Sequence, residues 1–207
     1  MFFDPRLGHS FNGDPFKALV VPRPIAWMST STKSGDSNLA PFSFFNLLLT
    51  DPAYLMVSCA GESDDKSKMK DTARNILDTR EFVVNIVQWQ HREKMVQTSK
   101  NLPYGKSEFE DAELEMRKCR FISAPRLADS PVSMECQLYD HFILPSGGRG
   151  AQANVFIGEV IGMHIDEEII RDGRIDPGLL DIVGRMGYRD YVRANDPIRI
   201  NLPHKPK

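Results

Sequence analysis

Small polar side chains stand among aromatic ones over residues 38–46 of the sequence. Ser43 and Asn46 are interleaved there with three phenylalanines. Buried polar groups need hydrogen-bond partners, which a strand serving only the core would not offer. A flat aromatic ligand suits the mixture, because its faces stack on apolar side chains while short hydroxyl and amide groups orient its edges. The alternative is a turn-rich strand in which Asn and Ser cap the neighbouring backbone.

A second group of polar residues, Lys68, Lys70, Asp71 and Thr72, stands where we expect a helix to begin. Free N–H groups and the positive end of a helix dipole, together with a lysine and a threonine hydroxyl, suit a phosphate monoester. The same residues are also typical of ordinary helix capping by an aspartate beside solvated lysines. Taken alone, this group leaves both interpretations open.

Motifs of several other chemistries are missing from the sequence. No G-x-G-x-x-G follows an expected strand and no G-x-x-x-x-G-K-[ST] occurs, which excludes a dinucleotide fingerprint and a P-loop. The five histidines lie at least 23 residues apart and the three cysteines form no C-x-x-C, so we predict no metal site and no disulfide framework. Cys119 stands between Lys118 and Arg120, neighbours that favour a thiolate, whereas Cys59 and Cys136 fit buried apolar positions.

Composition places the chain among globular proteins. Of 207 residues, 41% are apolar and 26% charged, and the formal net charge is −2. A net charge so close to zero argues against a general DNA- or RNA-binding role. It does not argue against a local basic pocket. No apolar run reaches the roughly 20 residues that span a bilayer, and the first residues do not resemble a signal peptide. We therefore expect a cytoplasmic protein without a membrane partner.

Alternation of apolar and polar residues predicts a sheet. Residues 132–139 alternate strictly, residues 155–165 do so over a longer segment and residues 55–59 over a shorter one, so each predicts a strand with one buried face. Residues 82–87 are β-branched and apolar, which is typical of a strand buried on both faces. Residues 25–32 are a further expected strand.

Helices are fewer and shorter than strands. We predict a capped helix of about two turns after Asp71 and Thr72, a second over residues 90–99 and a short third from Pro177. Short strands with few helices favour a mainly β barrel or sandwich over a βαβ fold. The length fits a single domain, 1–207. Its expected surface loops are residues 61–70, 99–107 and 145–153, the last of them a hairpin loop or a lid.

Together, these groups of residues resemble the flavin reductase-like, FMN-binding split-barrel family. The matching segments, in the family's order, are Pro22–Trp27, Ser29-Thr30, Asn38–Asn46, Lys70-Asp71-Thr72 with Asn75, Glu81–Asn85, Glu108-Phe109, Ser130-Pro131, Glu135-Cys136, Gly158-Glu159-Val160 and Arg185–Tyr191. Single segments would be weak evidence, whereas the ordered set is specific. It covers about residues 15–192 and leaves 193–207 as a C-terminal tail.

What the resemblance implies is a Greek-key split β-barrel, mainly β with a few short helices, that is usually a homodimer with FMN near the subunit interface. The residues it assigns to FMN binding are Ser29, Thr30, Ala40, Ser43, Phe44, Asn46, Lys70, Asp71, Thr72 and Arg185. Ser29 and Thr30 would lie beside the flavin, and the segment from Ala40 to Asn46 would contact its ring edge, ribityl chain or phosphate.

By the same similarity, Lys70, Asp71 and Thr72 would hold the phosphate. Arg185 would reach the ligand from the C-terminal segment, although Met186-Gly187 follows it here where family members commonly carry Gly-Gly. The implied activity is NAD(P)H-dependent reduction of flavin, or of a small acceptor through bound FMN, with the flavin carrying the redox chemistry. No catalytic side chain is therefore assigned.

Three alternatives remain beside this activity. A flavoredoxin-like electron carrier would receive electrons from a partner protein instead of a nicotinamide. A non-enzymatic split barrel would bind flavin or another ligand without turnover. An enzyme similar to pyridoxamine-phosphate oxidases would use the same kind of barrel for a different oxidation. Fold alone does not decide among them.

Overall fold

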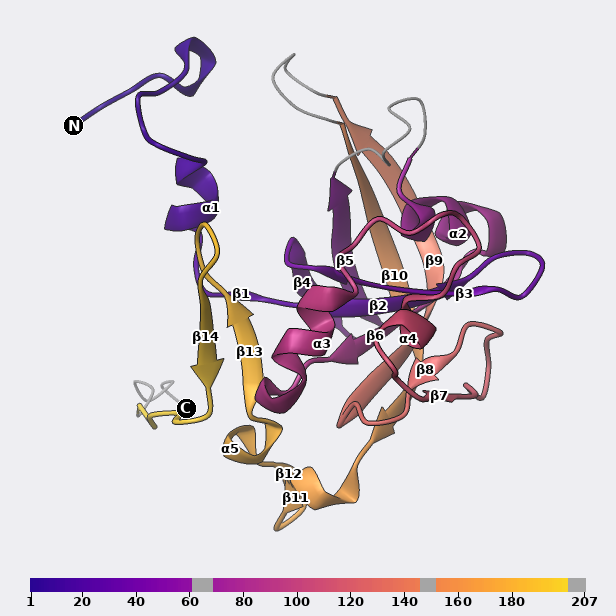
Figure 1. The fold of residues 1–207 in the computed structure, drawn as a ribbon. Helices are drawn as coiled ribbons and strands as arrows, with labels where there is room; N and C mark the ends of the chain where they lie inside the picture. The colour runs from indigo at the N-terminus through magenta and orange to yellow at the C-terminus, as the bar shows by residue number, and fades with distance from the viewer. Residues whose placement is uncertain (61–68, 146–151, 201–207) are drawn as a thin grey trace.

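The protein is built around one large antiparallel sheet, whose strands curl around a common core (Figure 1). The computed structural model describes residues 1–60, 69–145 and 152–200. The strand order is β3-β2-β6-β9-β10-β5-β4. In chain order these strands are β2 Ala26–Ser31, β3 Ser37–Phe42, β4 Phe45–Thr50, β5 Ala53–Ala60, β6 Glu81–Ile86, β9 Val132–Leu144 and β10 Ala153–Ile165.

A small second sheet joins the two ends of the chain. Strand β13 (Ile182–Arg185) lies between β1 (Arg23–Pro24) and β14 (Tyr191–Ala194). In Figure 1 this sheet lies beside the barrel, below helix α1, with α2 and α3 across from it. Two further short pairs are β7 Met116–Arg117 with β8 Arg126–Leu127, and β11 Ile170–Arg171 with β12 Arg174–Ile175.

Short helices connect the strands. They are α1 Pro15–Leu19, α2 Asp71–Thr79, α3 Arg92–Gln97, α4 Glu108–Asp111 and α5 Pro177–Leu180, with 3-10 turns at Pro5–Leu7, Trp89–His91 and Glu167–Ile169. Aspartates cap α1 and α5, where Asp14 and Asp176 each accept two backbone N–H groups. Over the described ranges, no helix combines the length and apolar character needed to cross a membrane.

Two buried apolar clusters hold the barrel and its helices together. Phe82 and Phe156 centre the first, against which α2 packs Ile76. Trp27 and Phe109 centre the second, on the side of α4. The first leaves no room beside Gly158, because a Cβ there would lie 2.3 Å from Cζ of Phe82. That position therefore accepts only glycine without repacking of the core.

The predicted strands and helices are confirmed, with two corrections here and one, on the capping of α2, below. Residues 132–139 do not bury one face only: Ser133 and Glu135 are fully buried opposite Met134 and Cys136, because other segments give their polar atoms hydrogen-bond partners. The second predicted helix starts as a 3-10 turn and becomes α-helical only from Arg92. The loops expected at 61–70 and 145–153 fall mainly outside the described residues.

Candidate functional site

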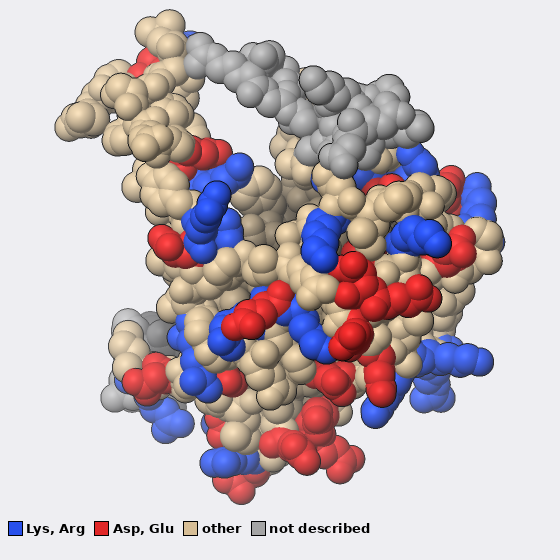
Figure 2. Space-filling model, in the orientation of Figure 1, with Lys and Arg blue, Asp and Glu red and all other residues tan. Residues whose placement is uncertain are grey.

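A cavity of about 780 Å³ opens between the barrel and the small β1-β13-β14 sheet. Figure 2 shows this face hollowed, with lysine and arginine side chains on both sides of the hollow. The volume falls in the range of small-molecule sites. The lining residues are Lys17, Arg23, Asn38, Ala40, Pro41, Phe42, Ser43, Phe44, Ser58, Ala60, Lys70, Asp71, Thr72, Arg74, residues 98–104, Glu108 and Arg185.

One wall is the end of β3 and the turn that follows it. Ala40, Ser43 and Phe44, which the family resemblance assigns to FMN binding, line the cavity there. The carbonyl of Phe44 accepts the N–H of Ser58 at 2.8 Å, which ties this turn to β5. Phe44 nevertheless keeps 39% of its surface exposed. An apolar ring beside short polar groups on a fixed turn is therefore available to a flat ligand.

Helix α2 begins at the cavity, and its N-cap residue provides no side-chain cap. Lys70 occupies the N-cap position without a side-chain hydrogen bond to the helix. Asp71 is the first helical residue and not the cap, so the capping interpretation drawn from the sequence is wrong. Because Lys70, Asp71 and Thr72 line the cavity, the helix end that the side chain of Lys70 leaves uncapped faces a ligand or water there.

Positive side chains flank this helix end. Lys70 Nζ donates to Asn101 Oδ1 at 2.8 Å, and the guanidinium of Arg74 lies 4.5 Å from the ring centre of Tyr104. Burial raises the pKa of Asp71, while Arg74 and Lys70 oppose the rise. Two cations and a helix N-terminus beside one partly buried carboxyl make this end of the cavity attractive to an anion.

Behind the wall, buried amides hold Thr72 and Thr30 in place. Asn38 Nδ2 donates to Thr72 Oγ1 at 3.0 Å, and Asn75 Nδ2 donates to Thr30 Oγ1 at 3.0 Å. The hydroxyl of Tyr104 donates to Asn75 Oδ1 at 3.2 Å. Thr30 is fully buried and does not line the cavity, so its connection to a ligand there runs through these amides and Thr72.

Two other predicted site residues lie away from the cavity. Ser29 is fully buried, where its hydroxyl donates to the carbonyl of Pro125 at 2.5 Å and accepts from Asn85 Nδ2 at 3.1 Å. Asn46 is exposed on β4, and its Oδ1 accepts the N–H of Leu47 at 2.9 Å. The structure thus brings together seven of the ten predicted residues, the seventh being Arg185, which reaches the cavity from β13.

Sequence reasoning missed several residues of the lining. Arg74 and Tyr104 are placed by helix phase and by an irregular loop, which local patterns do not resolve. Glu108 is buried at the start of α4, where its Oε2 accepts the N–H of Leu39 at 2.9 Å. Burial raises the pKa of Glu108, and nearby Asp71 adds to the rise. Residues 108–109 gave a signal only through the family resemblance.

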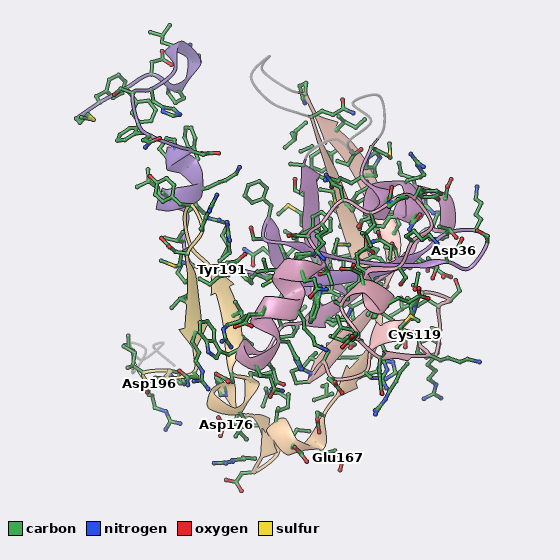
Figure 3. All side chains as sticks on the ribbon, viewed as in Figure 1. Asp36, Cys119, Glu167, Asp176, Tyr191 and Asp196 are labelled. Carbon is green, nitrogen blue, oxygen red and sulfur yellow. The ribbon has the colours of Figure 1, made fainter. Side chains whose placement is uncertain are left out.

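A cluster of possible metal ligands lies elsewhere, around Glu135. Ligand atoms of Cys119, Glu135 and His164 are within 4.8 Å of one another. His164 Nε2 lies 2.6 Å from Glu135 Oε1, and the N–H groups of Arg120 and Phe121 donate to the same carboxylate at 2.7 Å. These partners satisfy the carboxylate without an ion. Figure 3 labels Cys119 at this cluster, on the far side of the barrel from Tyr191.

The thiol of Cys119 is not activated by its basic neighbours. Burial, and then the negative charge of Glu135, raise the pKa of Cys119 to about 12. The thiolate-favouring environment expected from Lys118 and Arg120 is therefore wrong, because the fold turns the thiol toward a carboxylate. Burial also raises the pKa of Cys59 and Cys136, in agreement with their expected apolar role.

Comparison with known proteins identifies relatives over most of the chain. Residues 18–187 match the family model described as a flavin reductase like domain. An uncharacterized protein of Aquifex aeolicus is 38% identical over 85% of this chain and 86% of its own length. Nitrilotriacetate monooxygenase component B from Bacillus cereus superposes with a TM-score of 0.86 at 28% identity, covering 97% of this chain and 98% of that one. The Pseudomonas fluorescens 2-nitrobenzoate 2-nitroreductase NbaA gives a TM-score of 0.78 at 30% identity over 91% and 89%.

Proposed function

The chain belongs to the flavin reductase-like family, and on this premise we propose that it binds FMN and catalyses NAD(P)H-dependent reduction of flavin, or of a small acceptor through bound FMN. The family model spans residues 18–187, so the resemblance seen in the sequence and the mainly β split-barrel fold class are confirmed. Membership makes the protein a flavin-related oxidoreductase. FMN and a nicotinamide donor are the specific choices proposed.

The single observation that carries the choice of FMN is the uncapped start of α2 inside the cavity. A phosphate monoester there would accept the first-turn N–H groups and meet the charge of Lys70 and Arg74. Thr72, held by Asn38, would offer its hydroxyl to the same phosphate. Riboflavin lacks this group, so the arrangement favours FMN over riboflavin.

The wall from Ala40 to Phe44 suits the ring system. Phe44 offers an exposed aromatic face, and Ser43 with the backbone of the turn offers hydrogen-bonding groups to a ring edge or ribityl chain. When bound, the flavin would supply the redox chemistry by accepting a hydride from a reduced nicotinamide. The residues of this chain would bind and orient the ring, keep one face open to a second ligand and set the polarity near its edge.

A small acceptor agrees with what two structural relatives are named for. One is a component of a nitrilotriacetate monooxygenase and the other a 2-nitrobenzoate nitroreductase. Both names refer to a small organic acid, nitrilotriacetate in one and 2-nitrobenzoate in the other. We extend to this chain only the general property, transfer of reducing equivalents from the flavin to a second molecule.

We also propose that the protein is a homodimer. Strand β4 forms an edge of the large sheet and exposes Leu47, Leu48 and Leu49. An apolar edge strand of this kind is a typical association surface, and Asn46 on the same strand would then lie near the interface. Sedimentation velocity should give twice the 23.5 kDa of one chain; a single-chain mass at micromolar concentration would contradict the proposal.

The experiment that tests the proposed function is the visible spectrum of purified protein, followed by anaerobic NADH and then NADPH. We expect flavin absorption peaks that bleach within seconds and return in air. Free FMN at the same concentration is the control, because it should be reduced far more slowly.

Other outcomes separate the alternatives. Peaks that resist both nicotinamides but bleach with dithionite would indicate a flavoredoxin-like carrier. Oxygen consumption with pyridoxamine phosphate would indicate the oxidase-like alternative. A colourless protein that takes up no added FMN would contradict the central proposal.

A further inference from the structure

Two arginines face each other directly in the small sheet. Arg23 of β1 and Arg185 of β13 are partners in the antiparallel register, so their side chains leave the same face of the sheet. Like charges at directly opposed positions destabilise a pair of strands. Burial, and then the charge of Arg185, lowers the pKa of Arg23, while the carboxylate of Asp14 opposes the fall. A bound anion between the two guanidinium groups would offset their repulsion.

Arg23 is almost fully buried, yet its charge has no carboxylate partner. It is only 8% exposed, and its terminal nitrogens donate to the carbonyls of Lys17, Val20 and Met186. Its Nε is buried without a hydrogen-bond partner. Among the residues that the structure describes, no Asp or Glu oxygen lies within 4.0 Å of either guanidinium. A buried cation with an unused donor is costly unless a ligand completes it.

Arg185 is the accessible member of the pair. It donates to the carbonyl of Tyr188, and its guanidinium lies 4.5 Å from the ring centre of Tyr191, which fixes its orientation. Tyr191 is labelled on the small sheet in Figure 3. Lys17 is close by, but its charge is met by Asp14 at 3.4 Å. The positive charges on this side that lack an ion-pair partner among the described residues are therefore those of the two arginines.

Both arginines line the same cavity as the start of α2, but from the opposite side. Arg23 and Arg185 reach it from the small sheet, whereas Lys70 and Arg74 reach it from α2 across the hollow (Figures 1 and 2). FMN has one phosphate, and we assign its binding to the uncapped helix end with its two cations. A second cationic side is thus in excess of what the flavin requires.

We propose that the Arg23–Arg185 pair is a second anion site, which binds the anionic group of the molecule that exchanges electrons with the flavin. The inference rests on the proposed function. The group is a planar or tetrahedral oxyanion, because a guanidinium fork binds carboxylate and phosphate oxygens in pairs. It belongs either to the pyrophosphate of a nicotinamide dinucleotide or to the carboxylate of an acceptor. On this assignment Arg185 serves the second ligand and not the FMN phosphate.

The test compares Arg185→Met with Arg189→Met. Arg189 lies in the same turn but is exposed and does not line the cavity. FMN affinity is measured by flavin fluorescence, NADH affinity from the rate of anaerobic flavin reduction, and the binding of sodium pyrophosphate and sodium benzoate by calorimetry with and without flavin. We expect Arg185→Met to weaken at least one of these second ligands about tenfold and to change FMN affinity less than twofold. Arg189→Met should change none of them.

The two sources of the anion give different patterns. Weaker NADH and pyrophosphate binding would assign the site to the dinucleotide, and weaker benzoate binding alone would assign it to an acceptor carboxylate. Arg185→Lys, which keeps the charge but loses the fork, should fall between wild type and Arg185→Met. Arg185→Met relieves the repulsion between the arginines but loses the contacts with the carbonyl of Tyr188 and the ring of Tyr191, so its melting temperature is measured beside the affinities. A lower melting temperature with unchanged ligand affinities would indicate a purely structural role.

Two results would overturn the second site. One is FMN affinity falling tenfold with the other ligands unaffected, which would return Arg185 to the flavin phosphate. The other is no change in any ligand. If the wild-type protein binds no flavin, the proposed function fails by itself, and the calorimetry with pyrophosphate and benzoate on the flavin-free protein still decides whether the arginine pair binds anions.

Discussion

Lys70→Ala should weaken FMN binding about tenfold and leave riboflavin binding unchanged. Lys70 is the N-cap residue of α2 and lines the cavity, so its ammonium is placed to meet a phosphate at the helix end. A charge-assisted hydrogen bond of this kind contributes about 1.5–3 kcal/mol, which is a tenfold effect or more. Titration of flavin fluorescence against the two ligands measures the difference.

Lys106→Ala is the matched control for Lys70→Ala, because Lys106 is exposed and does not line the cavity. It should bind both flavins like the wild type. An equal loss of FMN and riboflavin affinity in Lys70→Ala would contradict the phosphate assignment, since only FMN has the phosphate. Lys70 would then act on the shape of the cavity, through its hydrogen bond to Asn101.

Glu135→Gln should lower the free energy of unfolding by about 2–4 kcal/mol, since it breaks a buried charged network. The carboxylate of Glu135 is fully buried and accepts the N–H groups of Arg120 and Phe121 as well as a contact from His164. An amide keeps one acceptor oxygen and turns an NH₂ group toward a second donor. Urea unfolding near pH 7 measures the loss.

The pH dependence of the free energy of unfolding gives a second test of the network around Glu135. Burial alone would raise the pKa of Glu135, but the N–H groups of Arg120 and Phe121 and the ring of His164 outweigh it and hold the pKa below its usual range. The stabilisation is therefore present above the unfolded-chain pKa of about 4.3 and is lost as the pH falls through the folded value. The difference between wild type and Glu135→Gln should shrink in acid.

Glu167→Gln is the control for charge alone, because Glu167 is exposed in a 3-10 turn. It should change the free energy of unfolding by less than about 0.5 kcal/mol. A loss of similar size in both variants would show that overall charge, and not the buried network, governs the effect. No loss in Glu135→Gln would contradict the role given to the network.

The fold could be predicted from the sequence wherever one periodicity dominated. Residues 82–87 were all apolar or β-branched around a single Asn, and β6 is buried through most of its length. Strand β4 was not predicted, because its exposed leucines do not alternate with polar residues and have no buried face in one chain. Glu135 was also not predicted correctly, because an alternating strand places a charged residue on the exposed face. It is buried instead, since residues from other segments form hydrogen bonds with its carboxylate.

The candidate site, like the fold, could be predicted from the sequence only in part. The wall at residues 38–46 and the start of α2 were predictable, because contiguous residues carry the chemistry. Thr30 and Ser29 were expected beside a ligand but lie behind the wall, since alternation along β2 does not reveal that both its faces are covered. The partnership of Arg23 with Arg185 has no local signal, because it depends on the register between strands from opposite ends of the chain.

The pairing of Arg23 with Arg185 also has a consequence for folding during synthesis. The helix end at Lys70 is synthesised before β13 and β14, which follow it by more than 100 residues. Pairing of such distant segments requires closure of a very long loop, which slows folding. A chain released before residue 182 would lack Arg185 and the strand that pairs with β1, while keeping the residues of α2 that line the cavity. The two sides of the cavity should therefore form at different times on the ribosome, with the flavin side preceding the side that would receive its reaction partner.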